Sequence, residues 1–146
     1  MKDSTLIIER DNSIFFSEGY KYQLRKRFHI TTVIKPIKPF RINFLEMDEH
    51  GNLWIDNGYA WNGASGPTWD TLSSMIGSLV HDAFYQLIRL GLVDFGYRDL
   101  ADKILHDLCT QDGMIELRAD YWEWAVVHFG AGSCRPSAEP KILVAP

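Results

Sequence analysis

The hydrophobic pattern of this chain changes its period once, at the loop 61–70, and this change constrains the fold more than any other feature. Before the loop, short β-prone runs alternate apolar and polar residues, most clearly over 40–45, which is typical of half-buried strands. After it, over 71–90, apolar residues recur at helical spacing. Strands followed by helices predict an α+β fold.

A chain of 146 residues is long enough for one domain with a core of its own. We therefore expect residues 1–146 to form a single domain in which an antiparallel β meander of about five strands precedes three helices. Asp11 and Asn12 between the first two runs favour a hairpin there. The predicted parts are a β-rich half (1–60), a Gly/Pro loop (61–70), a helical half (71–130) and an extended tail (131–146).

The three helices are expected at 71–90, at 97–112 and from 114 or 115 to 129. The first is apolar nearly all round, so it should be the most buried helix. Its main stripe is Leu72, Ile76, Leu79, Val80, Ala83, Leu87 and Leu90. In the third helix the residues at helical spacing are Leu117, Tyr121, Trp124, Ala125 and His128.

Composition excludes several classes of protein. The formal net charge of −4 gives no electrostatic reason to bind nucleic acid, and the basic cluster 21–27 is local. Two cysteines make no disulfide framework. The N-terminus lacks the layout of a signal peptide, and no apolar run reaches the length of a membrane span, about 18 residues. We expect no secretion by a signal peptide, no membrane span, no cofactor and no bound metal.

His81 and Asp82 form a His-Asp pair inside the apolar helix 71–90. His81 is either a core histidine with a hydrogen-bonded ring nitrogen or a general base or metal ligand. Asp82 points about 100° away on a helix, so it cannot orient His81 directly. A His-Asp metal site would need further ligands, for which the candidates are His29, His50, Asp99 and Asp102.

Asp102 and His106 lie four residues apart, on one face of the second predicted helix. This spacing suits two metal ligands or a hydrogen-bonded pair, and an exposed polar face is the alternative. A third interpretation turns Asp102 inward to bond His81. We expect His81 to be buried, with a ring nitrogen within hydrogen-bond reach of Asp102 or of the loop 62–65, because an unsatisfied buried imidazole costs about 1–3 kcal/mol.

The loop before the first helix is a candidate binding segment, made of Asn62, Gly63, Ala64 and Ser65. Its backbone amides suit an anion-binding nest, and a tight strand-to-helix connection is the alternative. Ser65 does not fit a nucleophile elbow, because Pro67 stands where that motif needs glycine.

Three segments carry a resemblance: Tyr59–Pro67, with Asn-Gly-Ala-Ser at its centre, Leu79–Tyr85, with Val-His-Asp-x-x-Tyr, and Leu100–Asp102. In order and spacing they resemble the domain of unknown function numbered 1353, a family of phages and prophage-bearing bacteria. Gly66 departs from the aliphatic residue usual in that family. The resemblance implies a phage context and adds Tyr85 to the binding residues, but it implies no established activity.

Three functions follow from these observations. The first is a phage structural or accessory protein, such as a small virion or tail component, which docks on other phage proteins through the apolar triplet 142–144 of its tail. Its location would be the virion or the host cytoplasm. The second is a hydrolase acting on peptidoglycan or a nucleotide, with His81, Asp82 and Asp102 as catalytic residues. The third is a small protein that binds a host factor.

Overall fold

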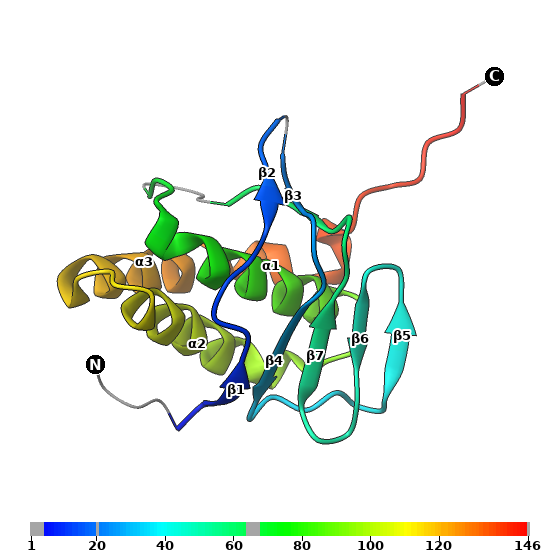
Figure 1. The fold of residues 1–146 in the computed structure, drawn as a ribbon. Coiled ribbons are helices and arrows are strands. Elements are labelled where there is room, and N and C mark those ends of the chain that lie inside the picture. The colour runs from blue at the N-terminus through cyan, green and yellow to red at the C-terminus, as the bar shows by residue number, and fades with distance from the viewer. Residues whose placement is uncertain (1–4, 20, 64–67, 146) are drawn as a thin grey trace.

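Antiparallel strands come first and three helices second, as the change of period predicted (Figure 1). This arrangement is seen in a computed structural model, which describes residues 5–19, 21–63 and 68–145. The α+β class of the chain is therefore confirmed.

The strands form two sheets. The larger has the order β1-β4-β7-β6-β5, and the smaller has the order β2-β3-β8. Every pairing in both is antiparallel. The strands are β1 (Ile7–Arg10), β2 (Phe16–Ser17), β3 (Tyr22–Leu24), β4 (Phe28–Thr32), β5 (Phe40–Ile42), β6 (Leu45–Met47), β7 (Asn52–Ile55) and β8 (Ala60–Trp61).

The hairpin predicted at Asp11 and Asn12 is wrong. β1 pairs with β4, and β2 pairs with β3. The reason is a contact distant in sequence: the Asp11 backbone N–H donates to the His29 carbonyl at 2.9 Å, and the His29 N–H donates to the Asp11 carboxylate at 2.9 Å. Asp11 thus prolongs the pairing of β1 with β4 instead of turning the chain back.

The helices are α1 (Met75–Arg89), α2 (Arg98–Gln111) and α3 (Glu116–Phe129). A 3-10 turn at Leu72–Ser74 leads into α1, and Leu72 is 85% exposed, so its place in the predicted apolar stripe is wrong. Gly91, with φ +76°, follows the end of α1, because a left-handed residue after a helix favours glycine.

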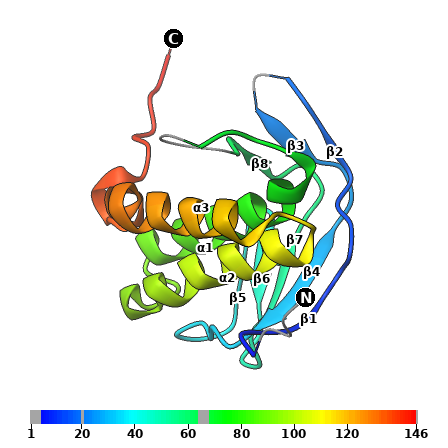
Figure 2. The ribbon, with the colours of Figure 1, turned by 90° about the vertical axis from the view of Figure 1, so that its left-hand side faces the viewer.

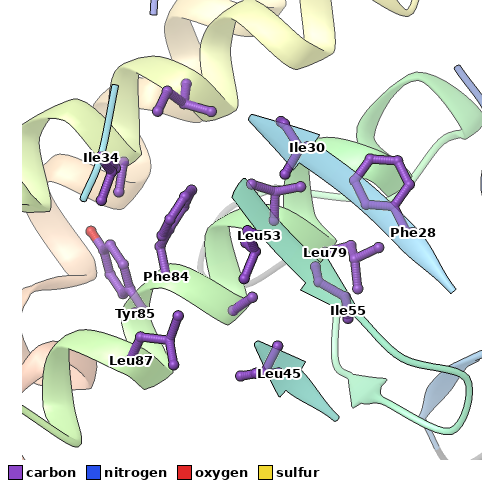
Figure 3. Packing of buried hydrophobic residues seen from close by; sticks show 14 of the residues in the cluster. Phe28, Ile30, Ile34, Leu45, Leu53, Ile55, Leu79, Phe84, Tyr85 and Leu87 are labelled. Carbon is purple, nitrogen blue, oxygen red and sulfur yellow. The ribbon is translucent and has the colours of Figure 1, made fainter. Parts of the chain in front are cut away.

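The core lies between the larger sheet and α1 (Figures 2 and 3). Figure 2 shows the helices on one side of this sheet, and Figure 3 shows side chains of β4, β6 and β7 facing those of α1. Most of α1 is buried, which confirms the prediction that it is the most buried helix. Among the fully buried residues are Phe28, Ile30, Leu45, Leu53, Ile55, Leu79, Phe84 and Leu87.

α3 packs on α2 through a face that the sequence pattern did not predict. Its buried residues are Ala119, Trp122 and Ala125. Of the predicted stripe, Ala125 is buried, whereas Leu117, Tyr121, Trp124 and His128 are exposed. Apolar residues on both sides of α3 made the choice of face ambiguous. None of the described helices is both long and apolar enough to cross a membrane.

The tail leaves the body of the molecule as an extended segment (Figure 1). Its apolar triplet Ile142, Leu143 and Val144 is 94%, 88% and 92% exposed. The triplet therefore does not pack on the body of its own chain. Cys109 and Cys134 are both buried free thiols, so they do not pair with each other.

Candidate active site

His81 and Tyr85 stand one turn apart on α1, and both reach Asp102 on α2. His81 Nε2 lies 2.7 Å from Asp102 Oδ1, and the Tyr85 hydroxyl donates to the same oxygen at 2.5 Å. The two rings contact each other at an interplanar angle of 42°, with their centroids 4.0 Å apart. His81 is 6% exposed and Asp102 is 1% exposed. The predicted burial of His81 and its bond to Asp102 are confirmed.

The proton positions at His81 follow from these partners. When the Asp102 carboxylate is ionised it only accepts hydrogen bonds, and Nε2 of His81 is then the donor of the bond between them. Nδ1 then remains as the nitrogen that can take up a further proton. This is the arrangement by which a buried carboxylate orients a catalytic imidazole.

Arg98 connects this cluster to α3. Its Nε donates to the Tyr85 hydroxyl at 3.2 Å, and its Nη2 donates to the carbonyls of Val126 and Val127 at 3.0 and 2.8 Å. Burial, together with the hydrogen bond to Asp102, raises the pKa of Tyr85 well above its usual range. Tyr85 therefore acts as a neutral donor that holds Asp102 in place.

Asp82 lies beside His81 but outside the hydrogen bonds around Asp102. Burial raises the pKa of its carboxyl to about 6, while His81 and a hydrogen bond from the Asn62 backbone N–H oppose that shift. A carboxyl that titrates near neutral pH serves as a proton acceptor or donor in catalysis. Asp82 is thus a second candidate acid–base group beside His81.

His81, Asp82 and Tyr85 line one pocket of about 490 Å³. The remaining lining residues come from β8 and the loop after it, from the polar side of α1, from the end of α3 and from the segment before β3. They are Lys21, Tyr59, Ala60, Trp61, Asn62, Gly63, Gln86, Arg89, Ala125, Val126, Phe129, Gly130 and Ser133. Asp102 lies behind His81 and does not line the pocket.

The loop 61–63 forms one wall of this pocket. Asn62 and Gly63 line it as predicted, whereas Ala64 and Ser65 lie outside the described residues. Gly63 has φ +79°, and a Cβ there would come within 2.7 Å of the Asp70 carboxylate, so this position requires glycine. A hydrogen bond of 2.7 Å from the Tyr22 hydroxyl to Asp70 Oδ2 crosses beside it.

Two tryptophans flank the loop and are held differently. Trp61 is buried, and its Nε1 donates to Ser78 Oγ on α1 at 3.1 Å. Trp69 is 59% exposed, but Arg118 of α3 lies 4.9 Å from its ring centroid and donates to its carbonyl at 2.7 Å. The loop is therefore fixed to α1 at one end and to α3 at the other.

The sequence did not single out several lining residues. Gln86 and Arg89 follow Asp82 by four and seven positions, so helical spacing could have placed them on the same side of α1. Lys21 comes from a segment far earlier in the chain, and no local pattern points to it. The Tyr59 hydroxyl donates to Gln86 Oε1 at 2.9 Å, which leaves the amide nitrogen of Gln86 available to a ligand.

The four-residue metal set considered for His81 does not assemble. Nε2 of His29 lies 2.8 Å from Asn52 Oδ1 on the neighbouring strand, and His50 is exposed beside Glu49. Neither histidine lines the pocket. His106 does not pair with Asp102 either, because its Nε2 lies 2.7 Å from Asp120 Oδ1 of α3.

A scan against protein-family models, a search of curated proteins and a search of solved structures find no match to this chain. The resemblance to the domain of unknown function numbered 1353 therefore stays a prediction, carried by its motif residues alone.

Proposed function

We propose that this protein is a hydrolase that uses Asp82 and His81 as a general acid–base pair. The observation that carries the proposal is that both side chains line one pocket while Asp102 holds His81 from behind. Tyr85 and Arg98 anchor Asp102 and involve all three helices, which gives the site the rigidity that acid–base chemistry needs.

The two groups have complementary roles in the proposal. Asp82, ionised at neutral pH, accepts a proton from the attacking water as its oxygen bonds to the substrate. His81, protonated at Nδ1 and stabilised by Asp102, donates a proton to the leaving group as the scissile bond breaks. Proton exchange with water then returns both groups to their starting states.

The pocket suits an anionic substrate that carries a ring. Lys21 and Arg89 bring positive charge, although Glu139 accepts a hydrogen bond from Arg89 Nε at 2.6 Å. Phe129, which is 63% exposed, provides aromatic surface on which a base or a sugar can stack, whereas Trp61 and Tyr59 are buried. Nucleotides and peptidoglycan fragments both combine an anionic group with a ring, so these two substrate classes remain the choices.

The test is an activity screen that compares the natural chain with the variant Asp82→Asn. The full chain is incubated with nucleotides and, separately, with purified peptidoglycan, and products are separated by chromatography. Asp82→Asn should reduce turnover by about 100-fold or more, because one acid–base group contributes 10²–10⁴-fold. Asp94→Asn, outside the pocket, is the matched control. Equal turnover in Asp82→Asn and the natural chain would overturn the proposal.

A phage structural or accessory role is the second candidate, and the exposed tail favours it. The apolar triplet 142–144 lies in water, where it gains nothing unless a partner covers it. In this proposal the tail docks on other phage proteins, in the virion or in the host cytoplasm. Binding to a host factor through the same segment is the third candidate.

A further inference from the structure

Where α2 meets the beginning of α3, we propose a zinc site made of His106, Glu116 and Asp120. One ligand atom from each residue lies within 4.8 Å of the others, so small side-chain movements bring all three to a single ion. None of the three lines the pocket around His81, so this site is distinct from the proposed active site.

The donor set fits zinc by its chemistry. One imidazole nitrogen and two carboxylate oxygens suit Zn²⁺, and three protein ligands leave a fourth position for water. Magnesium and calcium prefer oxygen ligands alone, so the imidazole disfavours them. Glu116 and Asp120 stand four residues apart on one face of α3, and His106 faces them from α2, so rigid helices position every ligand.

The charge around His106 also favours a divalent cation. Nε2 lies 2.7 Å from Asp120 Oδ1, and Nδ1 lies 3.3 Å from Asp107 Oδ1. Glu116 adds a further carboxylate, for which the described part of the chain offers no hydrogen bond or ion pair. A protonated imidazole supplies one positive charge against three carboxylates, whereas Zn²⁺ supplies two.

Zinc would join α2 to α3 in place of the present hydrogen bond. The Nε2 proton leaves, and Nε2 and the Asp120 oxygen both bind the metal. Because α3 buries only small side chains and Trp122 against its neighbours, a metal link across this contact should raise the stability of the helical half.

The experiment is calorimetric titration of the untagged full chain with zinc chloride alone, at pH 7.5. We expect one zinc per chain and a rise in Tm on saturation. Glu116→Gln and Asp120→Asn should each weaken binding by about tenfold or more. Glu123→Gln, which removes a neighbouring carboxylate of α3 outside the ligand set, should bind as the natural chain does.

Circular dichroism and a titration of His81→Asn serve as controls for folding and for the location of the bound zinc. Both ligand substitutions lie on exposed positions, and circular dichroism verifies that the variants fold. His81→Asn tests whether zinc enters the pocket instead, and it should leave the affinity unchanged. The zinc site would be overturned if the chain does not bind zinc stoichiometrically. It would also be overturned if the Glu116 and Asp120 variants bind zinc as tightly as the natural chain, or if a folded His81→Asn variant loses binding.

Discussion

Asp102 is the residue on which the buried polar cluster depends. Its side chain is 1% exposed, Oδ1 receives both hydrogen bonds, and Oδ2 has no partner among the described residues. A buried carboxylate is stable only while its donors compensate for lost water. His81 therefore supports the fold as well as the proposed chemistry.

Replacing His81 by alanine tests this structural part. The variant leaves Asp102 with Tyr85 as its one side-chain donor, so we expect the free energy of unfolding to fall by about 2–4 kcal/mol, the scale of a broken buried pair. Urea denaturation at pH 7 measures the change. His50→Ala, an exposed histidine, should stay within about 0.5 kcal/mol of the natural chain. Coincident unfolding curves for His81→Ala and the natural chain would show that His81 does not support the fold.

Asp82 should make the stability depend on pH. Burial raises its pKa from 3.8 to about 6, so the folded chain binds this proton more tightly than the unfolded chain does. Stability should therefore fall as the pH rises from about 4 to about 6, and the loss should persist above that range. Asp82→Asn, which cannot ionise, should be more stable by about 1–3 kcal/mol at pH 8 and equally stable near pH 4. A pH-independent difference would contradict this interpretation.

The sequence could predict some of the residue contacts in the candidate sites but not others. His81 and Asp102 could be paired in advance, because an imidazole in an apolar helix needs a polar partner and the next helix carries one. The partner of His106 could not be predicted, because the relative position of α2 and α3 decides whether His106 bonds to Asp102 or to Asp120. Lys21 joins the pocket only through the pairing of the smaller sheet.

At the scale of elements, the contact between α1 and α2 depends on a glycine. A Cβ at Gly77 would lie 2.9 Å from Cys109 Sγ, 3.0 Å from Leu105 Cδ1 and 3.3 Å from the Leu105 carbonyl. The two helices therefore pack closely one turn before His81. This contact sets the position of α2, and with it the position of Asp102.

Gly77→Ala should destabilise the protein by about 1–3 kcal/mol, although alanine is the better helix former, because the added methyl group overpacks the contact. Thermal unfolding measures the effect. The double variant Gly77→Ala/Cys109→Ala removes the nearest obstructing atom and should recover part of the loss. Gly132→Ala, where a Cβ meets nothing within 4 Å, is the control. A more stable Gly77→Ala variant would show that the helices can separate without cost.

α1 was predictable because its apolar residues form a nearly continuous surface that must be buried whatever it packs against. The strand pairing was harder to predict from the sequence. Asp11 is a typical turn residue, yet its hydrogen bonds to His29 hold it beside β4. For α3, apolar residues occur on both faces, so the sequence period does not identify the buried face. Only the contact with α2 decides which face is buried.

At the scale of the molecule, one layer of helices covers one side of the larger sheet, and the tail stands apart from both (Figures 1 and 2). Among the side-chain bonds of the described residues, the pair between Arg89 and Glu139 is the one nearest to the triplet. Residues 140–145 therefore add exposed apolar surface without adding to the core.

Deleting residues 140–146 tests the role of this segment. Tm should change by no more than about 2 °C, since a loss of 1 kcal/mol shifts Tm by only a few degrees in a chain of this size. Sedimentation across a concentration series should show weaker association for the shortened chain than for the full chain. A large drop in Tm would make the tail part of the fold, and identical sedimentation would contradict a docking role between copies.

The proposed chemistry requires Asp82 to be an acid–base group in the pocket beside His81. Carbon-13 NMR of the aspartate carboxyls, titrated from pH 3 to pH 9 and assigned by comparison with Asp82→Asn, measures its protonation without any knowledge of the substrate. We expect a midpoint of about 6 for Asp82, because burial raises the pKa of its carboxyl. A midpoint near the ordinary value of 3.8 would show that Asp82 is an ordinary solvated carboxylate, and it would contradict the proposed site.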